Sequence, residues 1–125
     1  MEESPREYDR EYTTTVSPTV RRRLGYSHDR GTVTRFVVQL EYRHDDDEWH
    51  EVVRYDHDPE SEQGHDVETE GLHIDVYRDG TKHWTEYIAP PMPAGVALDR
   101  AEDHLTQNTV AFIERYERWH GIRGQ

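Results

Sequence analysis

The sequence predicts a single α+β domain, in which a four-stranded antiparallel meander packs on one C-terminal helix. Three observations support this fold class. Between residues 34 and 88, apolar and polar residues alternate over four short segments, as they do in strands with one buried face. Three closely spaced prolines then interrupt the pattern. After them, apolar residues recur at steps of three and four, which is the period of an amphipathic helix.

The first two predicted strands form a hairpin over residues 34–44 and 49–56, joined by a turn of three aspartates at residues 45–47. Because side chains on a strand alternate between its two faces, every second residue should point toward the core. These core positions are Phe36, Val38, Leu40 and Tyr42 in the first strand, and Trp49, Val53 and Tyr55 in the second.

A long polar loop over residues 57–70 leads to a second hairpin. Its turn contains Gly80, which suits the positive φ that a tight hairpin turn requires. The fourth strand covers residues 82–88. The apolar positions expected to face the core are Leu72, Ile74 and Val76 in the third strand, and Trp84 and Ile88 in the fourth.

The predicted helix begins at about Asp99, or slightly earlier, and ends at Trp119. The three prolines before the helix end the preceding strand pattern, because prolines do not continue a hydrogen-bonded ladder. Its apolar positions include Leu105, Phe112 and Tyr116. We expect these three side chains to pack against the core positions Phe36, Val38, Leu72 and Ile74.

Residues 1–31 show no periodic apolar pattern, and the sequence predicts a flexible or extended tail there, followed by one domain over residues 32–125. The basic cluster of the tail is Arg21–Arg23. It is compatible with binding a phosphate or an acidic partner, although such a triplet is more often a solvated tail segment.

The charge composition is typical of a protein adapted to high salt. The net charge is -12, Lys82 is the only lysine among 15 basic residues, and only 32% of residues are hydrophobic. At molar salt the screening length falls to about 3 Å, so dense surface carboxylates repel each other little. We therefore expect a protein from a halophile. An acidic protein of low-salt origin, or an acidic interaction surface, is the alternative.

Composition also excludes several classes of site. The chain has no cysteine, which excludes disulfides and thiolate metal sites. No apolar run approaches the about 20 residues that a membrane span needs, and the first residues do not resemble a signal peptide. We expect a cytoplasmic protein with no membrane partner. The negative charge disfavours non-specific nucleic-acid binding, so any RNA contact would need a local site.

Histidines and aspartates are concentrated between residues 55 and 77. If the apolar residues of each strand face the helix, the polar residues between them share the opposite face. The loop residue His65 would fold over that face. The candidate catalytic residues are therefore His73, His65, Arg54, Asp56, Asp75, Tyr77 and His83.

Three interpretations of this polar face remain open. The first is the solvated face of an acidic sheet. The second is a metal-independent, ribonuclease-like site. In that site His73, together with His65 or His83, would transfer protons, Arg54 would bind the phosphate, and Tyr77 would assist by hydrogen bonding.

The third interpretation is a metal site, since mixed imidazole and carboxylate ligands suit zinc, iron or manganese. Its ligands would be Asp56, His65, His73 and Asp75. No compact ligand spacing fixes a coordination geometry, so the sequence predicts neither a metal nor a cofactor.

Residues 52–56, the histidine-containing loop and residues 72–80 resemble a family of small haloarchaeal proteins. More distantly, they are similar to TumE-type toxins of toxin–antitoxin pairs, which carry an Arg-Tyr-Asp segment before a histidine-rich loop and strand. The resemblance implies a toxin with an RNA target and an antitoxin partner. A non-enzymatic interaction module is the alternative. Two open sheet edges make a homodimer possible.

Overall fold

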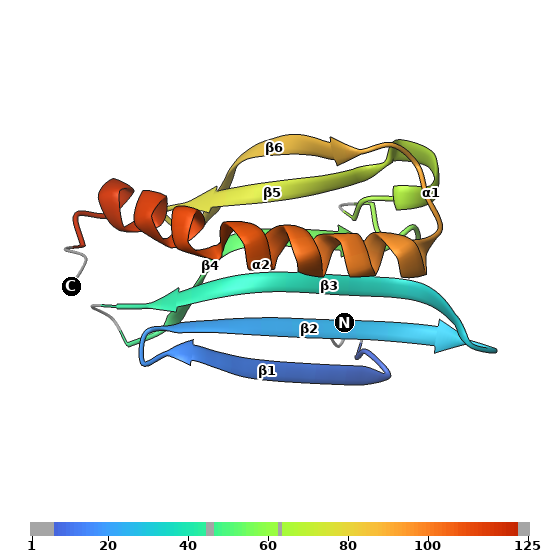
Figure 1. Ribbon diagram of the computed structural model, residues 1–125, viewed down its shortest axis with the longest axis horizontal. Coiled ribbons are helices and arrows are strands. Elements are labelled where there is room, and N and C mark those ends of the chain that lie inside the picture. Colours follow the sequence, from blue (N-terminus) through green and yellow to red (C-terminus); the bar gives the residue numbers. More distant parts are fainter. Residues whose placement is uncertain (1–6, 45–46, 63, 123–125) are drawn as a thin grey trace, which may run out of the picture.

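The computed structural model describes residues 7–44, 47–62 and 64–122, and it shows one antiparallel sheet with a long helix on one face (Figure 1). The six strands lie in sequence order, each paired with the next. The α+β class is therefore confirmed, and the count of four strands is wrong. The elements are β1 (Arg10–Ser17), β2 (Val20–Asp29), β3 (Thr32–Arg43), β4 (Trp49–His57), α1 (Val67–Glu70), β5 (Leu72–Arg78), β6 (Thr81–Ala89) and α2 (Ala94–Trp119).

The two additional strands, β1 and β2, lie in the segment that we expected to be a tail. β2 pairs with β3 along its whole length, from Val20 opposite Tyr42 to Asp29 opposite Thr32. Arg22 occupies a helix-facing position of β2 and bonds to Thr106 of α2, which interrupts the apolar alternation. The apolar alternation that would predict β2 from the sequence is weak for that reason. Residues 1–6 of the expected tail lie outside the described residues.

Most remaining boundaries agree with the sequence pattern to within a few residues, except that α1 lies within the predicted loop and α2 begins more than one turn before Asp99. The β5–β6 turn has positive φ at Asp79 and Gly80, as a tight hairpin requires. α2 begins at Ala94, directly after Pro93. Of the predicted aspartate turn, residues 45–46 lie outside the described residues. Within those described, no helix is long and apolar enough to cross a membrane.

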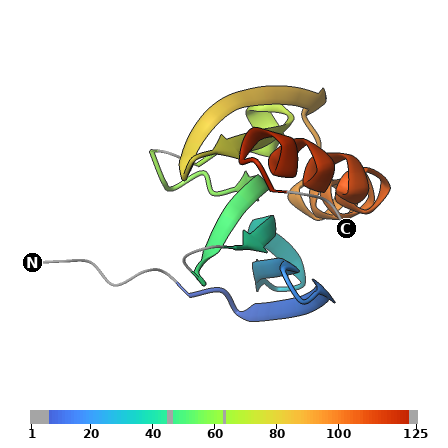
Figure 2. The same cartoon turned by 90° about the vertical axis from the view of Figure 1, so that its left-hand side faces the viewer.

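The core lies between α2 and the strands β3, β4 and β5 (Figure 2). Leu105, Phe112 and Tyr116 are buried, as predicted. Each fully buried large side chain contributes about 1.5–3 kcal/mol relative to an exposed one. Their expected partners on the sheet, Phe36, Val38, Leu72 and Ile74, are buried as well.

A β-bulge in β4 reverses the predicted orientation of its first residues. Leu40 pairs with Val53 but Glu41 pairs with Glu51, so Val52 is an extra residue. Residues before the bulge change face. Trp49 therefore lies on the face opposite α2, where the guanidinium of Arg21 is 4.2 Å from its ring centre. The prediction that Trp49 faces the core was wrong, because residue alternation alone does not reveal a bulge.

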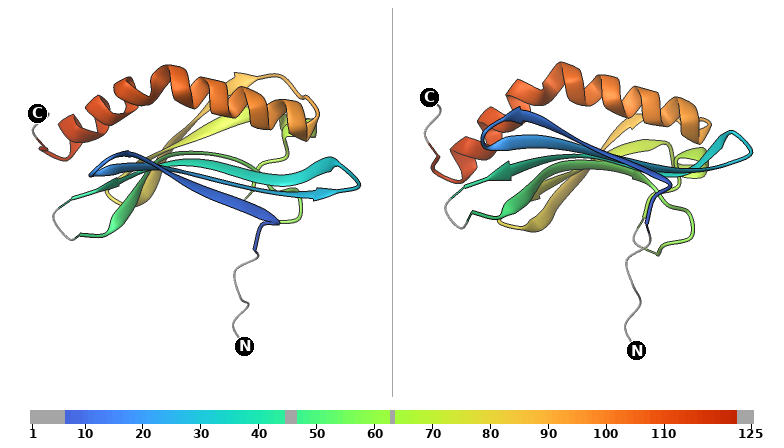
Figure 3. Two further views of the ribbon diagram at one scale, coloured as in Figure 1. Left: turned by 60° about the horizontal axis from the view of Figure 1, so that its bottom comes forward. Right: turned by 90° about the horizontal axis from the view of Figure 1, so that it is seen from below.

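We call the sheet face opposite α2 the open face. Figure 3 shows α2 on one side of the sheet and the loop that follows β4 on the other. Five polar side chains of the open face are nevertheless buried: Arg35, Gln39, Glu41, Asp56 and Asp75. Buried polar groups are costly unless they are paired, so this face is more than a solvated surface.

Candidate functional site

The loop between β4 and α1 covers the end of the open face that carries Asp56 and Asp75. Its two ends are joined by a hydrogen bond from the Asp58 backbone N–H to the His65 carbonyl, at 2.8 Å. Gly64 lets the chain pass closely, because a Cβ there would lie 2.7 Å from the Asp58 carbonyl oxygen. His57 closes the loop on the other side by accepting a hydrogen bond from the Val67 backbone N–H. These contacts place the His65 side chain over β5.

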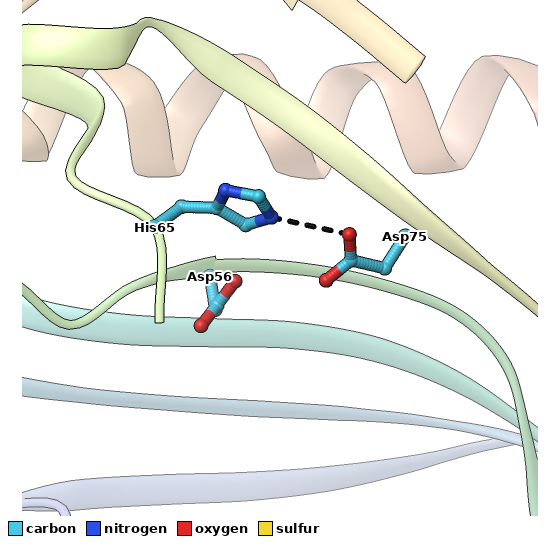
Figure 4. A group of neighbouring side chains, drawn as sticks. All are labelled: Asp56, His65 and Asp75. Carbon is cyan, nitrogen blue, oxygen red and sulfur yellow. Dashed lines mark hydrogen bonds and ion pairs between the residues drawn. The ribbon is translucent and has the colours of Figure 1, made fainter. Parts of the chain in front are cut away.

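Asp75 of β5 is the most highly connected group of the site (Figure 4). Its Oδ1 accepts a hydrogen bond from Thr85 Oγ1 at 2.7 Å and lies 3.1 Å from His65 Nε2. Its Oδ2 lies 3.3 Å from Lys82 Nζ. Burial alone would raise the pKa of Asp75, but the bonds from His65 and Thr85 and the charge of Lys82 lower it to about 2. Asp75 is therefore ionised at neutral pH.

Asp56 of β4 is buried beside Asp75, but its carboxylate oxygens have fewer hydrogen-bond partners among the described residues. Only 5% of its surface is exposed, and its Oδ1 has no hydrogen-bond partner among the described residues. Burial raises the pKa of Asp56, although the charges of Arg54 and His65 oppose this shift. The site therefore contains a desolvated carboxylate oxygen with free lone pairs.

His65 lies between two carboxylates. Its Nε2 faces Asp75, and its Nδ1 is 3.5 Å from Glu70 Oε1. The hydrogen bond to Asp75 raises the pKa of His65, and burial opposes the shift. The ring of His73 stacks on that of His65, with centroids 5.1 Å apart and planes 10° apart. His73 Nδ1 is 3.3 Å from the Gly71 carbonyl oxygen, and this contact fixes the His73 ring in its position against the His65 ring.

A pocket of about 350 Å³ opens beside the two aspartates. Arg54, Tyr77 and Lys82 line it together with Asp56 and Asp75. Burial raises the pKa of Tyr77, so its hydroxyl keeps its proton at neutral pH and can donate a hydrogen bond. We call this feature the Asp56–Asp75 pocket. It combines two cations, a phenol and the three carboxylates of Asp56, Asp58 and Asp75, of which those of Asp56 and Asp75 are buried.

A model of one protein family, described as a domain of unknown function (DUF7718), matches residues 4–122. The chain belongs to the DUF7718 family. No curated protein matches the chain, and no solved structure matches it either. The matched range includes β1 and β2, so the DUF7718 domain extends over the whole sheet and the helix.

One of the seven sequence-predicted residues lies elsewhere in the DUF7718 structure. Val76 pairs with Trp84 and Tyr77 pairs with Lys82, so His83 is an extra residue at a bulge. Its ring packs against Trp119 of α2, with centroids 5.4 Å apart. The expectation that His83 shares the open face was therefore wrong. The structure brings the other six residues together around the pocket: Arg54, Asp56, His65, His73, Asp75 and Tyr77.

The same bulge places Lys82 in the site, which residue alternation did not predict. Thr85 and Glu70 were also missed as partners of Asp75 and His65. The composition could have drawn attention to Lys82, because it is the only lysine in a chain that otherwise has arginine at these basic positions. The roles of Thr85 and Glu70 depend on strand register and loop closure, for which the sequence offers no signal.

The arginine triplet of the DUF7718 chain is divided between the two faces of β2. Arg21 and Arg23 lie on the open face and form ion pairs with the buried Glu41, whereas Arg22 faces α2. The three cations therefore do not act as one cluster. Arg21 and Arg23 neutralise a buried carboxylate.

Proposed function

We propose that this DUF7718 protein acts on the phosphodiester backbone of RNA at the Asp56–Asp75 pocket. The observation that carries the proposal is the position of Arg54 and Lys82, two cations that line a pocket with the buried carboxylates Asp56 and Asp75. Cleavage of a phosphodiester requires positive charge at the phosphate oxygens and groups that activate the attacking oxygen. The pocket supplies both.

Each side chain has a role that follows from its contacts. Lys82 is 43% exposed, so its ammonium can contact both Asp75 and a phosphate oxygen. Arg54 offers a guanidinium fork, which suits two oxygens of one phosphate. The Tyr77 hydroxyl donates a third hydrogen bond. Activation of the attacking oxygen falls to Asp56, His65 and Asp75, which lie close to one another; the two aspartates line the pocket and His65 contacts Asp75.

A mechanism with two proton-transferring imidazoles has less support than the cation arrangement. His83 lies at α2, and His73 is stacked behind His65. His65 therefore acts with carboxylate partners rather than with a second histidine.

The choice of RNA rests on the resemblance of β4, the following loop and β5 to TumE-type toxins. We propose a toxin-like protein of a high-salt cytoplasm whose partner is an antitoxin. The acidic surface disfavours non-specific duplex binding, so recognition of RNA falls to the local site.

A non-enzymatic interaction module is the second candidate, and exposed aromatic residues on both edge strands favour it. Tyr12 of β1 is 55% exposed and Tyr87 of β6 is 61% exposed. Exposed aromatics on open strand edges are typical of protein contacts, including contacts with a second copy of the chain.

A matched pair of aspartate variants tests the proposed function. Asp75→Asn removes the central carboxylate of the site, whereas Asp79→Asn changes an exposed aspartate in the β5–β6 turn. Cleavage of labelled single-stranded RNA in molar KCl should fall about 100-fold or more in the first variant. The second variant should behave as wild type. No cleavage by wild type, or equal rates in both variants, favours the interaction module.

A further inference from the structure

We infer that Asp56, His65 and Asp75 bind one divalent transition-metal ion, such as Mn²⁺ or Zn²⁺. The inference deepens the proposed function, and rests on it for the role of the ion, which would activate the oxygen that attacks the phosphate. The three residues come from β4, the loop and β5. Each offers one ligand atom, and these three atoms lie within 4.8 Å of one another.

The spacing of two of these atoms already fits a shared ion. His65 Nε2 and Asp75 Oδ1 are 3.1 Å apart. Ligand bonds of about 2.0–2.2 Å at tetrahedral or octahedral angles put neighbouring ligand atoms about 3.0–3.5 Å apart. An ion can therefore take the place of the shared proton without moving either side chain far.

Asp56 provides an independent reason to place a ligand here. Its side chain is almost completely buried, and its Oδ1 has no hydrogen-bond partner among the described residues. A buried carboxylate oxygen normally has a partner, and an ion is one of the few that fit a site lined with acids. The loop passes close to this carboxylate, since a Cβ added at Gly64 would lie 3.4 Å from Asp56 Oδ2.

The surrounding contacts orient the ligands in the way that metal sites require. Metal-binding histidines usually donate their second ring N–H to a carboxylate, and Glu70 Oε1 lies 3.5 Å from His65 Nδ1. This contact directs the lone pair of Nε2 toward the aspartates. Thr85 holds Asp75 by a hydrogen bond of 2.7 Å. Both contacts hold a ligand side chain in its orientation, and contacts of this kind raise metal affinity.

Lys82 is the group that competes with the ion, since its Nζ lies 3.3 Å from Asp75 Oδ2. Lys82 Nζ and His65 Nε2 contact different oxygens of Asp75, so an ion at Oδ1 leaves the Lys82 contact in place. One imidazole and two carboxylates suit Mn²⁺ or Zn²⁺. They suit Mg²⁺ and Ca²⁺ less, because these ions prefer all-oxygen sites.

The sequence already offered Asp56, His65 and Asp75, together with His73, as the ligands of one of three interpretations, although it predicted no metal. Asp56, His65 and Asp75 follow one another at steps of 9 and 10 residues, and they lie on two strands and a loop. Only the register of β4 with β5, in which Arg54 pairs with Asp75, brings the aspartates together.

Titration calorimetry of the tag-free, chelator-treated full chain tests the inference, with Mn²⁺ and Zn²⁺ as separate probes in molar KCl. We expect one site per chain for at least one of the two ions. Asp56→Asn should weaken binding about 100-fold or more, and His65→Gln, at a half-buried position, should do the same. The matched control is Asp79→Asn, which removes the same charge from the exposed β5–β6 turn. It should change affinity by no more than about threefold.

Two results would overturn the inference: no binding of either ion to a folded wild-type chain, or binding that survives both ligand variants. Circular dichroism of each variant confirms folding, and His65→Gln decides the question if Asp56→Asn does not fold. Metal binding without RNA cleavage supports the metal site and removes the proposed function. Full RNA cleavage by a chain that binds neither ion supports the function and removes the metal site.

Discussion

Lys82 Nζ lies 3.3 Å from Asp75 Oδ2 because a bulge at His83 shifts the register of β6 by one residue. The same bulge turns His83 to α2. One local irregularity therefore replaces an imidazole of the open face with an ammonium. In the proposed function, this exchange favours phosphate binding by cations over proton transfer between two histidines.

The position of Lys82 predicts that its replacement weakens RNA binding. A hydrogen bond to a charged group contributes about 1.5–3 kcal/mol, so Lys82→Gln should raise KM for RNA by roughly 10–100-fold. Arg78→Gln is the control, because Arg78 lies over the Trp119 ring, with its guanidinium carbon 5.0 Å from the ring centre. Steady-state cleavage rates measure the effect. Equal KM values in both variants would contradict the phosphate-binding role.

Packing of α2 on the sheet predicts unequal effects of two truncations on that helix. Leu105 is fully buried, whereas Val110 is 69% exposed. Leu105→Ala should lower the free energy of unfolding by about 2–5 kcal/mol, because it leaves a cavity. Val110→Ala should change it by less than about 0.5 kcal/mol. Urea unfolding in molar KCl measures both, and a stable Leu105→Ala variant would show that α2 packs differently.

The acidic surface predicts stability that depends on salt. With a net charge of -12, the folded chain repels itself at low ionic strength, and molar KCl screens this repulsion. The melting temperature should rise steeply from low to molar KCl. Differential scanning calorimetry measures this directly. A melting temperature that does not depend on KCl would identify the charge as an interaction surface instead.

His104 predicts a pH dependence that is separate from the site. Its Nδ1 lies 2.6 Å from the Tyr55 hydroxyl, and burial lowers the pKa of His104. The unfolded chain, with a histidine pKa of about 6.5, then binds more protons than the folded chain below that pH. The stabilising contribution is present above about pH 6.5. It is lost as the pH falls from there toward the lower folded pKa.

The variant His104→Gln should remove this part of the pH dependence. Urea midpoints of wild type and variant, compared between neutral and mildly acidic pH, isolate the contribution of His104 from that of the other histidines. Parallel pH curves for the two proteins would contradict the assignment.

The sequence predicted the positions of strands in which apolar residues alternate, but it did not predict the bulges within them. Residues 34–44 and 82–88 correspond closely to β3 and β6. β2 was missed because Arg22 occupies a helix-facing position, where it bonds to Thr106 instead of packing as an apolar residue. Local pattern cannot identify such a position, since the compensating partner is 84 residues away.

The site was predictable where alternation holds and unpredictable where it fails. Asp56 and Asp75 were placed on the open face because β4 after its bulge and β5 keep strict alternation. Lys82 and His83 were exchanged by the bulge in β6. The strain and twist of paired strands determine where a bulge occurs, and a single strand sequence contains little information about either.

The most direct test compares RNA cleavage by His65→Ala and His83→Ala. Both variants lose one imidazole, but His65 bonds to Asp75 in the site and His83 packs on Trp119. Initial rates on a labelled single-stranded RNA in molar KCl should fall about 100-fold or more for His65→Ala and remain at the wild-type level for His83→Ala. Equal rates for the two variants, or a loss confined to His83→Ala, would contradict the assignment of the function to the Asp56–Asp75 pocket.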